Sequence, residues 1–276
     1  MKPYLRLGVS VQHPRHGIEP GGYWLPWRPI VRSGANETRR RKKLSDLLDE
    51  PGLRARFDTV RKISGRVRSS EYHLTNACNI RCDGCWFFAK DFDRRTTEPP
   101  SVERWRLFAK EQALEGVSAA LLIGGEPTLF PDRIEAFQDE MEFVTVSSNG
   151  LRPLPVDGFE RVAIALTLFA GVGEDDRLRA IAPSGRRFEG LFERALSNYR
   201  NDPRATFIYA LDARCTHLID ETVARIEDNG NVVSFNYYSD YNEISHGSSS
   251  VDIEARLLEE VLRVTEQYPE TVISHP

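Results

Sequence analysis

The sequence predicts an α/β protein, built as a partial (β/α)6 TIM-like barrel that follows an N-terminal extension. Short apolar runs alternate with helical patterns from residue 71 onward, which is typical of parallel βα units. Six such runs occur, two fewer than a closed eightfold barrel requires. With 276 residues, 40% of them hydrophobic, the chain can bury a substantial core. We expect residues 1–70 to form the extension and residues 71–276 the barrel domain.

The expected strands are short runs rich in apolar and β-branched residues, and turn-forming residues bound them. Their ranges are 71–75, 119–123, 143–147, 161–168, 206–211 and 232–238. The run 161–168 is almost continuously apolar, which predicts a strand that is buried on both faces.

Helices are expected between these strands, where apolar residues recur every three or four positions. The first begins after Ser101, a suitable N-cap, and the others span 131–140, 188–200, 220–228 and 252–267. The apolar sides of the first and last helices should face the core. They carry Leu107, Phe108 and Leu114 in the first helix, and Leu257, Leu258, Val261 and Leu262 in the last.

Residues 1–70 read differently from the rest of the chain. Residues 4–11 predict a strand, and the dense basic run 39–43 precedes leucines at helical spacing. We interpret the basic run as the solvated start of a helix that ends at Pro51-Gly52, with a patch for an acidic partner as the alternative.

Charge and hydropathy exclude several classes of partner. The formal net charge is −4, so no global basic field favours nucleic acid or an anionic membrane. The longest apolar run, 162–172, is too short to span a bilayer, and the N-terminus lacks a signal-peptide core. Four cysteines, three of them close together, suit a reducing cytoplasm rather than a disulfide framework. Residues 271–276 resemble the beginning of a further element, which leaves open a truncated C-terminal part.

Cys78, Cys82 and Cys85 fall within eight residues, in the spacing C-x3-C-x2-C. This window follows the expected strand 71–75. Such spacing wraps a short loop around a compact inorganic centre and supplies three thiolates, one fewer than a closed 4Fe–4S or zinc site needs. The fourth position is therefore exchangeable, or it is filled from elsewhere in the chain.

Two further motifs end expected strands. Residues 121–127 finish in Gly-Gly-Glu-Pro, and residues 144–150 finish in Ser-Ser-Asn-Gly. In parallel βα barrels the reactive groups lie at the carboxyl ends of the strands. We therefore expect the cysteine loop and both motifs to meet at one rim of the barrel.

With these motifs in this order, the region of about residues 71–240 resembles the radical S-adenosylmethionine (SAM) enzymes. That superfamily is marked by a C-x3-C-x2-C loop after the first strand, a GGEP-type motif after the second, and frequently a TNG-like or SNG-like ending on the third. The resemblance implies a six-unit barrel in which Cys78, Cys82 and Cys85 bind three irons of a 4Fe–4S cluster, while SAM chelates the fourth. It also implies reductive cleavage of SAM to a 5′-deoxyadenosyl radical that abstracts hydrogen from a substrate.

The same resemblance suggests which residues bind SAM. Gly124 and Gly125 would place backbone groups beside the methionine amine, since glycine lets backbone approach a ligand closely. Glu126 would brace that turn or accept a hydrogen bond from the ammonium. Ser148 and Asn149 would donate to the methionine carboxylate or the ribose, whereas the alternative is an ordinary Asn-Gly turn.

Two later positions complete the expected cofactor site. Thr167 lies near the end of the fourth strand, where superfamily members often contact cofactor or substrate, and a threonine bonded only to backbone is the alternative. Arg179 resembles a post-strand arginine that holds the cofactor carboxylate, with a surface arginine as the alternative. The chain departs from the superfamily pattern at Gly84, where an aromatic residue often packs near adenine. Trp86 and Phe87 follow, as substitutes for it or as plain packing residues.

The cysteine loop has a second interpretation, a structural zinc site with His73, His217 or Cys215 as fourth ligand. The protein would then be a noncatalytic structural or regulatory module that binds zinc, or an iron–sulfur cluster that is indifferent to SAM. A third interpretation keeps the cluster and SAM but transfers a methyl group. The resemblance further implies a peptide or small-metabolite substrate and a flavodoxin- or ferredoxin-type electron donor. It assigns no residue to the chemistry on the substrate.

Overall fold

The structure is a computed structural model that describes residues 54, 58, 62, 66–169, 171–211, 213–237 and 251–273. The chain divides into two units, residues 1–68 and 69–276, and the sheet belongs to the second. The strand expected at 4–11 and the helix expected after the basic run 39–43 lie outside the described residues.

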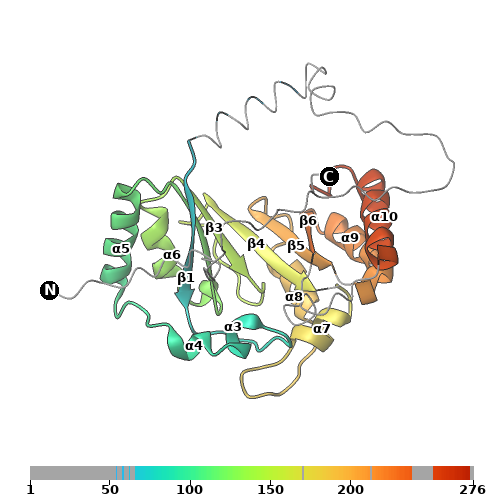
Figure 1. Ribbon diagram of the computed structural model, residues 1–276, viewed down its shortest axis with the longest axis horizontal. Coiled ribbons are helices and arrows are strands. Elements are labelled where there is room, and N and C mark those ends of the chain that lie inside the picture. Colours follow the sequence, from blue (N-terminus) through green and yellow to red (C-terminus); the bar gives the residue numbers. More distant parts are fainter. Residues whose placement is uncertain are drawn as a thin grey trace, which may run out of the picture. The chain divides into compact units, whose positions relative to one another are not determined.

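Six parallel strands form one sheet in the order of the sequence (Figure 1). They are β1 (Ser69–Thr75), β2 (Ala119–Gly124), β3 (Phe143–Ser148), β4 (Val162–Phe169), β5 (Ala205–Leu211) and β6 (Val232–Tyr237). Each strand pairs with the next in parallel register, and β1 and β6 stand at the two ends of the order. The predicted α/β class and partial (β/α)6 barrel are therefore confirmed.

The longer helices follow the strands and pack against the sheet in one hydrophobic core. They are α5 (Val102–Leu114), α6 (Pro131–Gln138), α8 (Leu191–Asn198), α9 (Ile219–Asp228) and α10 (Val251–Gln267). Short elements were not predicted, because four to six residues are too few to show helical periodicity. They are α3 (Trp86–Ala89), α4 (Phe92–Arg95), α7 (Glu174–Arg179) and the 3-10 turns η1 (Pro127–Leu129) and η2 (Ala213–Leu218). Figure 1 shows α3, α4 and α7 at the end of the barrel where β1 finishes.

The two faces of the sheet have different environments, as β4 illustrates. Ile164 and Leu166 are buried in the core that the helices cover, whereas Ala163 is exposed and Thr167 is half-buried. The prediction that this strand is buried on both faces is wrong, because the inner face of an open barrel lines a cleft. Alternation along each strand therefore assigns one set of side chains to the core and the other to the cleft.

Two helices present different faces to the core than the leucine spacing predicts. The leucines expected in the core but exposed are Leu107, Leu114, Leu258 and Leu262. In α5 the buried side chains are Trp105 and Ala109, and in α10 they include Leu257 and Val264. The ring of Trp105 fills the space under α5, so the leucine-rich side of that helix turns outward. Burial at i and i+4 or i and i+7 fits helical geometry in both cases.

The segment after α10 continues along the sheet. Val272 forms a parallel bridge with Val233 of β6, and Ile273 donates a backbone hydrogen bond to the carbonyl of Val233 (2.9 Å). Among the helices that the structure describes, none combines the length and apolar character that a bilayer crossing requires.

Candidate functional site

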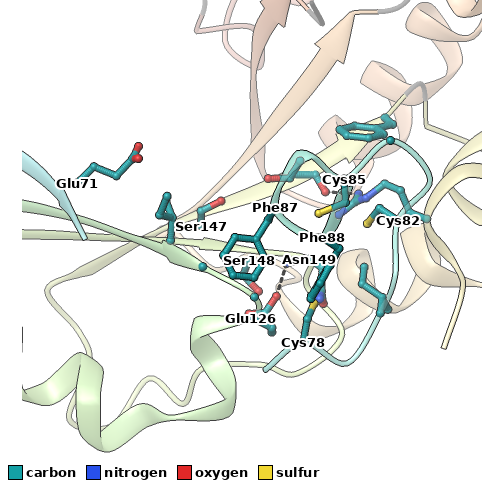
Figure 2. A pocket seen from close by; sticks show the side chains of 18 residues that line it. Glu71, Cys78, Cys82, Cys85, Phe87, Phe88, Glu126, Ser147, Ser148 and Asn149 are labelled. Carbon is teal, nitrogen blue, oxygen red and sulfur yellow. Dashed lines mark hydrogen bonds between the residues drawn. The ribbon is translucent and has the colours of Figure 1, made fainter. Parts of the chain in front are cut away.

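A cleft of about 350 Å³ opens at the carboxyl ends of β1 to β4, and Figure 2 shows the side chains that line it. All ten residues proposed from the sequence to bind metal or cofactor line this cleft. They are Cys78, Cys82, Cys85, Gly124, Gly125, Glu126, Ser148, Asn149, Thr167 and Arg179. The structure thus brings together residues that are up to 101 positions apart (179 − 78). Their individual roles remain predictions.

The segment around α7 anchors the cysteine loop. Arg81 and Asp83 donate backbone hydrogen bonds to the carbonyls of Ile181 and Leu178, both at 2.7 Å. Ile80 is 1% exposed and packs in a small apolar cluster that includes Ala180 and contacts Cys78 and Cys82. The three loop cysteines are free and half-buried. These contacts anchor the loop to the segment around α7.

Glu98 holds the start of the loop. One carboxylate oxygen accepts hydrogen bonds from the backbone N–H of Asn76 (2.5 Å) and from the Thr75 hydroxyl (3.2 Å). The other pairs with Arg133 of α6 (2.5 Å), which also donates to the carbonyl of Leu74 (2.8 Å). Burial raises the pKa of Glu98, but these hydrogen bonds lower it more, so the net shift is downward. An ionised Glu98 thus fixes the chain two residues before Cys78.

The two glycines at the end of β2 are required by their contact with the cysteine loop. Gly125 donates a backbone hydrogen bond to the Thr75 carbonyl (2.7 Å), and Glu126 donates one to the Ala77 carbonyl (2.8 Å). A Cβ at Gly125 would lie 2.0 Å from the Ala77 oxygen, and a Cβ at Gly124 would lie 2.6 Å from the Thr75 oxygen. Gly124 also has φ +137°, which side-chain-bearing residues rarely adopt.

Glu126 is 1% exposed and connects the ends of β2 and β3. One oxygen accepts from the backbone and hydroxyl of Thr128 (3.1 and 2.8 Å), and the other accepts from the backbone N–H of Asn149 (2.8 Å). Burial raises the pKa of Glu126, and these hydrogen bonds oppose that shift. The Asn149 amide then donates to the Asn79 side chain in the cysteine loop (2.7 Å). These contacts hold the turn together, and the predicted hydrogen bond from the cofactor ammonium to Glu126 stays a prediction.

Ser148 and Asn149 also form the turn that was the alternative interpretation. The Ser148 hydroxyl accepts from the N–H of Gly150, and the Asn149 side-chain oxygen accepts from the N–H of Leu151, both at 3.0 Å. Both residues line the cleft as well. The same turn therefore forms part of the cleft wall.

Arg179 is 3% exposed, so the alternative that it is a surface arginine is wrong. Its guanidinium pairs with buried Asp175 (2.7 Å) and donates to the Thr167 carbonyl. Burial lowers the pKa of Arg179, but Asp175 and Cys82 raise it more, so the arginine stays charged. Burial raises the pKa of the Cys82 thiol, and the nearby guanidinium opposes this. Arg179 Nε is buried and has no hydrogen-bond partner in the part of the chain that the structure describes.

The residues offered for a zinc site lie elsewhere. Among the described residues, the cleft lining does not include His73, His217 or Cys215. His73 is hydrogen-bonded to Asn76 (2.7 Å) and stacks on Phe87 at 4.7 Å between ring centroids. Within the same part of the chain, no group of three His, Cys, Asp or Glu side chains is gathered as a single metal ion requires. A cubane takes each thiolate on a different iron, so three thiols on one loop at a cleft fit it.

Sequence reasoning missed the residues that support the site. Glu98, Arg133 and Asp175 brace it through side chains that carry no motif, and their partners are distant or lie in elements too short to predict. Asn79 follows the first cysteine directly, and that position was the only available signal. Glu71 lines the cleft from β1 and was noticed only as the start of a strand.

Comparison with known proteins agrees with this geometry. Residues 72–190 match the model of the radical SAM superfamily. A GTP 3′,8-cyclase of Lactiplantibacillus plantarum is 30% identical over 146 residues, which cover 47% of this chain and 40% of that protein. A GTP 3′,8-cyclase of Aquifex aeolicus is 27% identical over 121 residues, which cover 38% and 37%. The chain thus spans about two fifths of the length of these curated relatives.

Solved structures share the fold. Streptococcus suis SuiB bound to precursor peptide SuiA has a TM-score of 0.56 at 15% identity, over 90% of this chain and 58% of that one. The enzyme anSMEcpe with bound AdoMet (that is, SAM) and Cp18Cys peptide has a TM-score of 0.52 at 13% identity, over 73% and 62%. At these identities the likeness shows the fold alone.

Residues 72–190 are therefore similar to the radical SAM superfamily, to which the model that they match belongs. The cofactors of that superfamily are a 4Fe–4S cluster and SAM.

Proposed function

We propose that this protein is a radical SAM enzyme whose 4Fe–4S cluster is held by Cys78, Cys82 and Cys85. The observation that carries the proposal is the convergence of these three thiols with both strand-end motifs on one cleft. Held at these residues, the cluster and SAM would supply one-electron reductive cleavage of SAM and hydrogen abstraction from the substrate, with the electron delivered by an external donor.

The residues of the chain bind and orient the cofactors. The glycine pair lets the end of β2 lie directly against the cysteine loop, so that backbone groups face the cleft. Arg179 offers its buried Nε to an anionic group such as the methionine carboxylate. Glu126 keeps Asn149 in place, while Ser148 and Thr167 add polar groups to the same wall.

The substrate is proposed to be a peptide or a small metabolite, and the electron donor a flavodoxin or ferredoxin. Two fold neighbours were solved with bound peptides, whereas the curated relatives are named for GTP. Free cysteines are consistent with the reducing cytoplasm as the proposed location. Hydrogen abstraction would make the enzyme an oxidoreductase in the broad sense.

Anaerobic reconstitution with iron and sulfide, followed by dithionite and SAM, tests the proposal. We expect release of 5′-deoxyadenosine, measured by liquid chromatography, in the wild type and in the Cys215→Ala control, since Cys215 is buried outside the cleft. Cys82→Ala should release none. A protein that binds zinc and releases no 5′-deoxyadenosine would refute the proposal, and release of S-adenosylhomocysteine instead would indicate methyl transfer.

A further inference from the structure

Glu71 is the one charged residue in the six strands, if His73 is counted as neutral. Along β1, Tyr72 and Leu74 point into the core, whereas Glu71 is exposed and lines the cleft. Figure 2 shows its carboxylate on the strand wall, away from the cysteine loop. Placing a charge on the inner wall of a barrel costs solvation free energy once a substrate fills the space. We therefore expect the substrate to carry a group that compensates the charge of Glu71.

The carboxylate of Glu71 is available to a ligand. Among the described residues, two other side chains with a carboxylate or a guanidinium line the cleft, Glu126 and Arg179. Both have partners within the fold. Glu126 accepts hydrogen bonds from Thr128 and Asn149, and Arg179 pairs with Asp175. No hydrogen bond or ion pair to the side chain of Glu71 occurs in the part of the chain that the structure describes.

The strand positions beside Glu71 on the inner wall carry no charge. The half-buried positions next to Glu71 across the sheet include Leu121 and Thr145, which are in register with it, and Ser147 lies further along β3. None of the six strands contains lysine or arginine. Cations of this kind bind the phosphates of a nucleoside triphosphate, whereas a carboxylate repels them, and Arg179, which lines the cleft, is already paired with Asp175. An ammonium or guanidinium group is complementary to Glu71 instead.

We propose that Glu71 is a specificity residue that binds the side chain of a lysine or arginine in a peptide substrate. This inference rests on the proposed radical SAM function. Glu71 precedes Thr75, the last residue of β1, by four positions, which corresponds to roughly 13 Å along the strand. The cationic side chain would therefore anchor the peptide deep in the barrel, below the level of the cysteine loop. β1 is the first strand in the sheet order, so none of the described strands pairs with its outer edge.

The test uses the reconstituted full chain with SAM and two dye-labelled Gly-Ser peptides of equal length, one with arginines and one with glutamates at the same positions. Binding is measured by fluorescence anisotropy at low ionic strength, where screening is weak. We expect the arginine peptide to bind about tenfold more tightly or better, as a charge-assisted hydrogen bond implies. Glu71→Gln should abolish this preference, and Glu71→Lys should reverse it. The matched control is Glu142→Gln, which removes one exposed carboxylate outside the cleft.

Equal binding of the two peptides, no binding of the arginine peptide, or a preference that survives Glu71→Gln would overturn the inference. GTP provides a further arm, since tight GTP binding by the wild type would also contradict it. Release of 5′-deoxyadenosine by the wild type without peptide separates the two proposals. If the wild type releases it but shows no charge preference, only the Glu71 inference fails.

Discussion

Two of the ion pairs near the cysteine loop differ mainly in burial. Asp175–Arg179 lies below the loop with side chains 1% and 4% exposed, whereas Glu98–Arg133 lies at its start with side chains 23% and 15% exposed. A buried pair recovers its desolvation cost only while both partners are present. The partly exposed pair can rely on water if one partner is lost. Removal of one partner should therefore cost more stability in the Asp175–Arg179 pair than in the Glu98–Arg133 pair.

The largest effect is expected from Asp175→Ala. It removes the acceptor of three interactions, from Arg179 and from the backbone N–H groups of Phe169 and Gly171, and leaves the guanidinium buried without its counter-charge. We expect a loss of about 3–5 kcal/mol in the free energy of unfolding, measured by urea denaturation of the apoprotein. Glu193→Ala, which breaks an exposed pair with Arg225, should cost about 1 kcal/mol or less. Similar losses in the two variants would contradict the role of burial.

Gly125→Ala is expected to come next. Its Cβ would lie 2.0 Å from the Ala77 oxygen, so the end of β2 and the cysteine loop would have to separate. We expect a loss of about 1–3 kcal/mol, together with reduced iron bound per chain after reconstitution. Gly158→Ala is the control, because no atom of the described residues lies within 4 Å of its Cβ, although φ is +82°. That variant should keep its full iron content, and an equal fall in both variants would argue against the contact.

Glu98→Gln should have a smaller effect, about 1–2 kcal/mol, because the amide keeps one acceptor for Asn76. The pKa of folded Glu98 lies below the ordinary value of 4.5, so its ionised form stabilises the protein above pH 4.5. That contribution is lost as the pH falls through the folded pKa. Stability measured from pH 7 down to pH 3 should therefore fall less steeply in Glu98→Gln than in the wild type. Parallel curves for the two proteins would show that Glu98 does not contribute this dependence.

Much of the candidate site could be predicted because its residues belong to sequence motifs. Cys78, Cys82 and Cys85 lie close together in the chain, and the glycines of residues 124–125 follow a recognisable strand, so local spacing was enough to place them. The parallel βα pattern then required that they meet at one rim, which the structure confirms.

The supports could not be predicted, because they depend on packing between distant elements. Nothing in the sequence around Glu98 or Arg133 indicates that residues 35 positions apart pair beside the cysteine loop. The prediction of which helix faces are buried was wrong for a related reason. Leu107 and Leu114 follow helical spacing, but the larger Trp105 occupies the core beneath α5. Hydrophobic period identifies a helix more reliably than it identifies the face that is buried.

The central claim is that three thiols of one loop hold a cluster with an iron free for SAM, and spectroscopy of the reconstituted protein tests it most directly. Under anaerobic conditions with dithionite, electron paramagnetic resonance should show a reduced 4Fe–4S signal that changes shape when SAM is added. Cys215→Ala should behave like the wild type, and Cys82→Ala should lose the SAM-dependent change. A protein without a cubane signal, or with one that SAM leaves unchanged, would contradict the claim.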